Sequence, residues 1–240
     1  QEVSDKNSPN VIYFTKQNKI GPSLEVPTEE ERQRKDFDLS DAIAVSQLSS
    51  PQAVSPQKVR GSYGPSADIP IATARSRKAI NPLILGVWEN FPDVVNVPIE
   101  KGRFFTEGER KARESVAVIG FGIANQVFEE GNPLGESIKL DGKLFKVIGV
   151  LGKSSGEGVI GSDEIDERSI YIPFETSEKF YPGIDENLIA VRAPNGRVDE
   201  VIDEVTSLLR KRRGLQFDQP NNFGVNRSEQ IFTLVNDVIN

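Results

Sequence analysis

Residues 115–151 read SVAVIGFGIANQVFEEGNPLGESIKLDGKLFKVIGVL, and this stretch decides the fold of the chain. A β-branched run at 116–119 predicts a buried strand. The apolar residues within 123–128 are spaced for one face of a short helix. The Asp-Gly pair at 141–142, between two alternating segments, is a strong signal for a hairpin turn. We therefore expect strand, glycine turn, helix and hairpin in that order.

The glycine turn resembles the beginning of a dinucleotide-binding fingerprint, because Gly120 and Gly122 lie between the strand and the helix. Asn125 stands where that fingerprint has its third glycine. The fingerprint also needs a parallel βαβ unit, whereas the predicted hairpin favours antiparallel pairing. We therefore interpret the turn as a simple connection and keep a nucleotide-binding enzyme domain as an alternative.

The composition excludes several classes of function. The chain has 240 residues, a net charge of −7 and a pI near 4.9, which opposes a nucleic-acid partner. It contains no histidine, cysteine or methionine. A Ser-His-Asp triad, a cysteine nucleophile, a zinc site with imidazole ligands and a disulfide are thus all excluded. The missing initial methionine suggests a piece of a longer protein.

The sequence also lacks the signatures of a membrane span and of an ATP site. No run approaches the 18 or so apolar residues that a spanning helix needs. Gly152, Lys153 and Ser154 end like a phosphate-binding loop, but Val147 occupies the position of its first glycine. We predict no catalytic, cofactor-binding or metal-binding residues.

Residues 152–167 form a glycine-rich, acidic segment that we expect to be a long loop. Its acidic spacing does not fit a calcium loop, and a solvated loop is the simpler interpretation. Long ordered loops often carry function. We therefore select it as the candidate partner-contact loop, with Gly156, Ser162, Asp163 and Asp166 as candidate residues.

The flanking segments predict a mixed architecture of strands and helices. At residues 41–48 we expect a helix with Ile43 and Leu48 facing inward, capped by Asp38 or Ser40. Residues 107–114 read as a charged surface segment without a specific role. The clearest helix spans 198–213, with acids early and bases late, in agreement with the helix dipole. Strands are expected at 11–15, 57–62, 69–77, 169–174, 188–192 and 223–226.

Five short motifs in order resemble the extracytoplasmic core domain of MacB-type ABC-transporter permeases. The chain shows GRFFT at 102–106, VAVIG at 116–120, a helix ending in Phe128, NPLG at 132–135 and FKVIGVL at 145–151. None is diagnostic alone, but the ordered set is specific. The resemblance covers roughly residues 11–231 and is weakest over 17–35.

The resemblance implies an α+β fold with two subdomains. A porter-like α/β subdomain would form from both chain ends, residues 1–80 and 185–228. A sabre-like, mainly β subdomain would be inserted at 81–184. Residues 229–240 would begin a stalk helix toward a membrane span.

The implied function is non-catalytic. The domain would lie on the periplasmic side of the cytoplasmic membrane and couple ATP hydrolysis by a cytoplasmic ATPase to export or mechanotransmission. Expected partners are a second permease copy, that ATPase and a periplasmic adaptor, without a cofactor or nucleic acid. Lipoprotein-releasing and cell-division permeases remain alternatives, and so does a periplasmic module that binds substrate itself.

Overall fold

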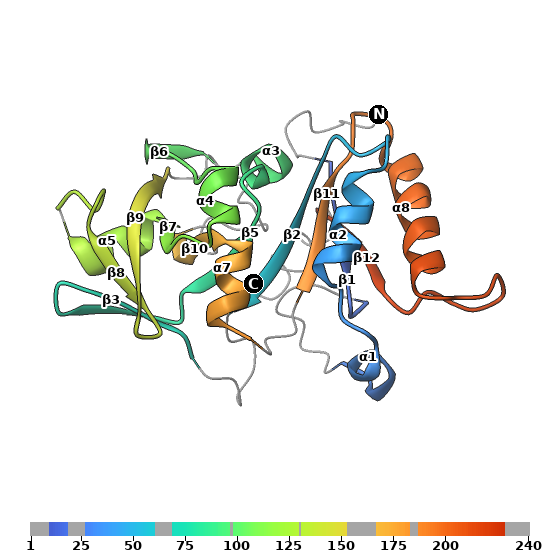
Figure 1. Cartoon of the computed structure of the whole chain (residues 1–240), viewed down its shortest axis with the longest axis horizontal. Helices are drawn as coiled ribbons and strands as arrows, with labels where there is room; N and C mark the ends of the chain where they lie inside the picture. Colours follow the sequence, from blue (N-terminus) through green and yellow to red (C-terminus); the bar gives the residue numbers. More distant parts are fainter. Residues whose placement is uncertain are drawn as a thin grey trace, which may run out of the picture.

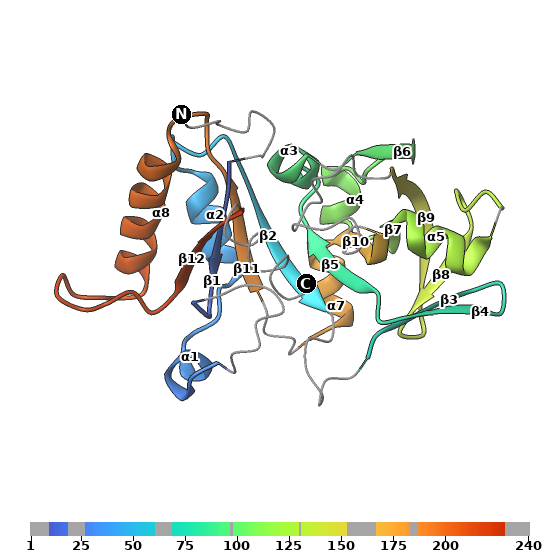
Figure 2. The same cartoon turned by 180° about the vertical axis from the view of Figure 1, so that it is seen from behind.

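The computed structural model describes residues 10–18, 27–60, 69–96, 98–129, 131–152, 167–182 and 187–228. Figures 1 and 2 show two lobes joined in the middle of one sheet. No helix in these ranges is long and apolar enough to cross a membrane.

The first lobe is built from both ends of the chain. Its helices are α1 (Glu29–Gln33), α2 (Leu39–Ser46) and α8 (Val198–Arg212), and its strands are β1 (Val11–Thr15), β2 (Ala53–Arg60), β11 (Asn187–Arg192) and β12 (Gly224–Arg227). All pairs among these strands are antiparallel. Helices α2 and α8 cover one face of them (Figure 1). Ile12 and Phe14 point into that interface and pack against Val45, Val201 and Leu209.

The second lobe comes from the middle of the chain. Its helices are α3 (Phe91–Val95), α4 (Glu107–Lys111), α5 (Phe121–Phe128) and α7 (Phe174–Phe180). Its strands are β3 (Ile71–Ala74), β4 (Arg77–Ile80), β5 (Leu83–Val87), β6 (Ile99–Gly102), β7 (Val116–Ile119), β8 (Ser137–Leu140), β9 (Lys143–Leu151) and β10 (Ser169–Pro173).

One mixed sheet runs through both lobes in the order β12-β1-β11-β2-β5-β10-β7-β9-β8-β3-β4, with β6 beside β9. Strands β2 and β5 join the lobes, with Gln57 opposite Val87. A shared apolar core reinforces this junction, because Val11 and Tyr13 of the first lobe belong to one buried cluster with Leu85 and Tyr171 of the second. The fold is thus a mixed α+β arrangement, as the sequence predicted.

The ends of the described chain meet in the first lobe. Strands β1 and β12 are antiparallel neighbours, and Ile12 lies opposite Arg227. The chain therefore enters β1 and leaves β12 at the same end of the lobe, which is the geometry of a domain inserted between two other segments.

Two sequence predictions about the N-terminal half are wrong. The single strand expected at 69–77 is a hairpin, in which Arg75 and Ser76 form the turn with φ of +48° and +64°. For α2, the predicted Asp38 cap is confirmed and Leu48 packs partly buried against the core. The helix begins at Leu39, two residues earlier than predicted, and the predicted inward position of Ile43 is wrong. Its buried face therefore carries Ala42 and Val45, while Ile43 is 43% exposed.

The predicted subdomain boundary at residue 80 stays a prediction. Strand β3, which that boundary assigns to the first subdomain, pairs with β4 and β8 at the far end of the sheet. The predicted stalk from residue 229 lies outside the described residues.

Candidate functional site

The candidate contact residues Gly156, Ser162, Asp163 and Asp166 all lie outside the described residues. Within the described ranges, no group of three or more His, Cys, Asp or Glu side chains is placed to hold a metal ion. The described residues hold three features that could bear on function: crowded glycine turns, buried charges and a depression beside α5.

The glycine turn before α5 allows close packing of the backbone against the chain that leads into β10. A Cβ atom on Gly122 would lie 2.9 Å from the carbonyl oxygen of Glu167. The amide of Gly120 donates a 2.7 Å hydrogen bond to the carbonyl of Ser169. The chain just before β10 thus lies directly against the start of α5, where a dinucleotide phosphate would have to bind.

The prediction that the hairpin leaves no parallel βαβ unit around α5 is wrong. Strand β9, the return strand of the predicted hairpin, pairs with β7 in parallel, with Val116 opposite Lys146. The antiparallel hairpin of β8 and β9 is confirmed, and Asp141 and Gly142 form its turn with φ of +48° and +81°. Both pairings are possible because β9 lies between β7, its parallel neighbour, and β8, its antiparallel neighbour.

The GRFFT motif at 102–106 connects β6 to α4 at a crowded point. Gly102 has φ of +75°, and a Cβ atom there would lie 2.2 Å from the carbonyl oxygen of Ile148 in β9. Phe105 is buried, and Phe104 packs against the ring of Tyr171. The motif therefore requires glycine for close backbone approach and aromatics for the shared core.

The arginine and threonine of the same motif fix the start of α4. Thr106 caps the helix in a reciprocal capping box with Glu109. Arg103 donates two 2.8 Å hydrogen bonds to the Glu109 carboxylate. Chiefly through the Arg103 hydrogen bond, the pKa of Glu109 is held down at about 2, although burial opposes the shift. Glu109 thus stays ionised, and it ties the motif to the helix.

Arg110 of α4 is the centre of a buried charge cluster. Its side chain is 11% exposed, its Nε donates a 2.5 Å hydrogen bond to Glu89, and its Nη1 donates to Glu175 of α7. Its guanidinium carbon lies 5.2 Å from the ring centre of Trp88. Trp88 in turn packs against the core of the first lobe. The cluster therefore ties α4 and α7 to a residue that contacts the other lobe.

The predicted surface segment at 107–114 is mostly exposed, but the buried Arg110 gives it a structural role that the sequence did not predict. Trp88 is half-buried at the junction of the lobes. The signal that sequence reasoning missed is the Thr-x-x-Glu capping box at Thr106, which marks the start of a helix.

A second set of contacts tightens the junction between β2, β5 and α7. Lys58 of β2 is paired with Glu178 of α7 at 2.7 Å, and its side chain is only 6% exposed. A Cβ atom on Gly86 would lie 2.0 Å from Oγ of Ser177. Helix α7 thus lies so close to β5 that only glycine fits beneath it. We call the β2–β5 pairing with the Arg110 and Lys58 contacts the lobe junction.

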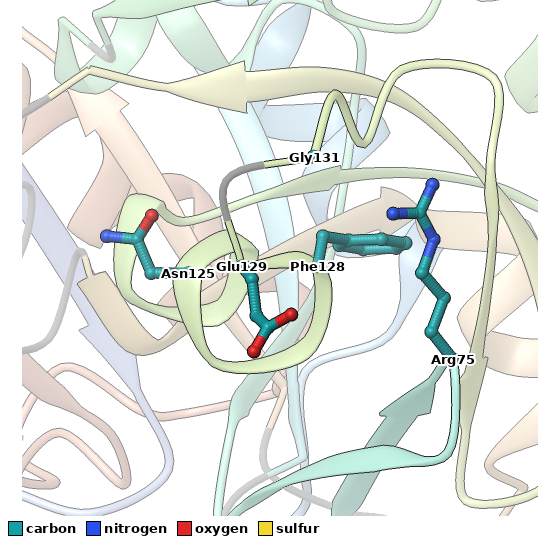
Figure 3. A pocket seen from close by; sticks show the side chains of 5 residues that line it. All are labelled: Arg75, Asn125, Phe128, Glu129 and Gly131. Atoms are coloured by element: carbon teal, nitrogen blue, oxygen red, sulfur yellow. The ribbon is translucent and has the colours of Figure 1, made fainter.

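The prominent depression of the second lobe lies beside α5. It has a volume of about 660 Å³ and is lined by Arg75, Asn125, Phe128, Glu129 and Gly131 (Figure 3). Arg75 stacks 5.7 Å from the Phe128 ring centre and is paired with Glu136 at 2.9 Å. Glu129, which also lines the depression, is paired with Arg77.

The comparisons with known proteins agree with this architecture. The sequence model of the family described as MacB-like periplasmic core domain matches residues 1–208. The chain belongs to this family. The GRFFT, VAVIG and NPLG motifs that carried the resemblance lie in the second lobe, and Gly102 of the first motif lies at a crowded backbone contact.

Curated relatives that match are export proteins. The pyoverdine export ATP-binding/permease protein PvdT of Pseudomonas entomophila is 33% identical over 125 residues, which is 51% of this chain and 19% of the relative. The macrolide export ATP-binding/permease protein MacB of Bdellovibrio bacteriovorus is 39% identical over 114 residues, 46% of this chain and 17% of the relative. The matched part is thus about a fifth of these relatives' length.

Solved structures show the same fold along nearly the whole chain. The periplasmic region of MacB from Actinobacillus actinomycetemcomitans superimposes with a TM-score of 0.72 at 20% identity, covering 98% of this chain and 97% of that one. The extracellular domain of the ABC-type transporter YknZ from Gram-positive bacteria gives 0.66 at 17% identity, covering 92% and 100%. These identities establish the fold alone.

Proposed function

We propose that this chain is the non-catalytic, extracytoplasmic part of an ABC export permease, and that it couples ATP hydrolysis in the cytoplasm to export outside the membrane. The observation that carries the proposal is the family match over residues 1–208. The names of the relatives describe those proteins as export permeases with an ATP-binding part, which supports the export role proposed here.

The geometry supports a domain inserted between two membrane segments. Both ends of the described chain lie at one end of the first lobe, where Ile12 faces Arg227. A movement of the flanking segments would therefore act on β1 and β12 together. The first lobe would pass that movement to the second through the lobe junction, because β2 and β5 share hydrogen bonds and a core.

The proposed mechanism is a population shift between two arrangements of a dimer. Each arrangement would be favoured by one state of the cytoplasmic ATPase, and the extracytoplasmic domains of two permease copies would come together or separate. A periplasmic adaptor would be a further partner, and the transported substrate is left open. Lipoprotein-releasing and cell-division permeases of similar build remain alternative settings for the same domain.

The location can be tested with a single cysteine, because the chain has none of its own. Phe217 is fully exposed, so Phe217→Cys provides an accessible thiol. In the full-length protein from which other cysteines are removed, a membrane-impermeant maleimide should label it in cells with a permeabilised outer membrane and an intact inner membrane. Labelling only after the inner membrane is lysed would refute the extracytoplasmic location.

A further inference from the structure

The outer side of the sheet in the second lobe has an unusual composition. Helix α5 packs on the inner side of β3, β4 and β9, where Ala72, Ala79 and Phe145 are buried. Because strand residues alternate between faces, their neighbours point to the side that α5 leaves open. We call this side the outer face; it carries Ile71, Lys78, Ile80, Lys139, Leu144 and Lys146.

Three apolar residues of the outer face are exposed, and two of them are direct cross-strand neighbours. Ile71 of β3 lies directly opposite Ile80 of β4, and they are 40% and 59% exposed. Leu144 of β9 is 56% exposed. The solvent face of an antiparallel pair normally alternates to polar side chains. Adjacent exposed apolar side chains among polar ones are a mark of an interaction surface.

The charges of the outer face are all of one sign. The sequences of β3, β4, β8 and β9 contain no aspartate or glutamate, although the whole chain has more acids than bases. Lys78 and Lys139 flank Thr73 in one cross-strand row, and Lys139 lies opposite Leu144. Among the described residues, none of the three lysines forms an ion pair, whereas the nearby Asp141 is paired with Arg60.

We propose that the outer face is a docking surface for an acidic, partly apolar segment of a partner protein. Carboxylates of the partner would pair with the lysines, and its apolar side chains would cover Ile71, Ile80 and Leu144. Complementary charge would mainly speed association and set specificity, while the apolar contacts would slow dissociation. The contact would therefore weaken steeply with salt.

Two other occupants fit the face less well. A second copy docked through the same face about a twofold axis would place lysines against lysines. A lipid surface fits the chemistry but not the position. Figures 1 and 2 place the β3–β4 hairpin at the lower edge of the second lobe with α5 above it, while β1 begins in the upper part of the first lobe. The outer face of the hairpin thus points away from the end where the chain enters and leaves. This last step rests on the proposed function, in which the membrane lies at that end.

The test uses a photo-cross-linking amino acid, p-benzoylphenylalanine, in the full-length protein in intact cells. It is placed at Leu144, with Ile43 as the control because Ile43 is an exposed apolar residue of the first lobe. We expect Leu144 to give an adduct with a different protein and Ile43 to give none. No adduct at Leu144, an adduct with a second copy or with lipid, or equal adducts at both positions would overturn the proposal.

The protein captured at Leu144 is then purified and its affinity for the chain measured by calorimetry. Replacing the lysines together (Lys78→Glu, Lys139→Glu, Lys146→Glu) should weaken binding at least tenfold, and raising NaCl from 50 to 300 mM should also weaken it. If the triple variant does not fold, Leu144→Ser, at an exposed position, tests the apolar part alone. Unchanged affinity in the folded variant would refute the proposed docking surface. So would binding of the chain to phosphatidylglycerol vesicles that is as tight as its binding to the captured protein. Neither result would bear on the export function.

Discussion

Replacing Arg110 tests whether the charge cluster holds the lobes together. Arg110→Met keeps an unbranched stem beside Trp88 but leaves the carboxylates of Glu89 and Glu175 without their cation. These side chains are 27% and 15% exposed. Breaking a buried ion pair by removing one partner costs about 3–5 kcal/mol, and the partial exposure of Glu89 lowers that to about 2–4 kcal/mol in the free energy of unfolding.

The assay is urea unfolding of the isolated chain. Trp88 is the only tryptophan, so its fluorescence reports directly on this cluster. With a slope near 3 kcal/mol per M, expected for a chain of this size, the midpoint should fall by about 1 M. Arg32→Met is the matched control, because Arg32 is 53% exposed and its ion pair among the described residues is with Glu29 of its own helix. It should cost no more than about 0.5 kcal/mol.

A second variant separates the loss of charge pairing from the loss of packing. Adding Glu89→Gln and Glu175→Gln to Arg110→Met removes the unpaired carboxylates, so at least half of the lost stability should return. A loss below 0.5 kcal/mol for Arg110→Met, or no recovery in the triple variant, would refute the reasoning.

Three further predictions concern the helix cap, the crowded glycine and the exposed loop. The folded-state pKa of Glu109 is about 2, below its ordinary value of 4.5, so its contribution to stability is complete above pH 4.5 and is lost as the pH falls toward 2. Glu109→Gln should therefore be less stable by about 1–2 kcal/mol at pH 6 and equal to the native protein near pH 2 in urea unfolding; a gap that does not change with pH would contradict this. Gly102→Ala should lower the free energy of unfolding by about 3 kcal/mol or more, because its Cβ would meet the Ile148 carbonyl at positive φ. Gly142→Ala also has positive φ but open space around it, so it should cost about 1 kcal/mol. Equal losses of stability for the two variants in thermal unfolding would contradict the packing role of Gly102. Phe217→Ser should change the free energy of unfolding by less than 0.5 kcal/mol, because the ring is fully exposed, and a larger loss would show that it packs on the protein.

The sequence predicted elements that depend on local signals. The helix expected at 198–213 is α8, Val198–Arg212, because its apolar positions recur at helical spacing and its dipole is matched by the charges at each end. The hairpin at Asp141 and Gly142 was also predicted from a local signal, because the Asp-Gly pair tolerates positive φ at both residues. Such signals act within a few residues and need no tertiary partner.

Features that depend on distant residues were not predicted. Arg110 meets Glu89 and Glu175 across 21 and 65 positions, so its burial has no local signal. The turn at Arg75 and Ser76 has positive φ without glycine or asparagine, and a continuous strand was the natural expectation. The parallel pairing of β7 with β9 depends on the hairpin folding back across the sheet, which spacing alone does not determine.

The candidate site was predicted least well. The contact loop chosen from composition, with Asp163 and Asp166, stays a prediction because it lies outside the described residues. The outer face could not be predicted from the sequence, because Lys78, Lys139 and Lys146 come from three strands that only the sheet brings together. Surface function in a β-rich lobe is encoded across strands, and the strand order has to be known first.

The most direct test of the coupling role is the number of substrate molecules exported per ATP hydrolysed. It is measured with the full-length transporter in proteoliposomes, using the substrate that the transporter is found to export. The variant lacks residues 12–227 and bridges the gap with a short glycine-serine linker, which is feasible because Ile12 and Arg227 are opposite each other on paired strands. We predict that the variant still hydrolyses ATP, within about threefold of the intact protein as an order of magnitude, while export per ATP falls to background. Export per ATP equal to that of the intact transporter would contradict the account.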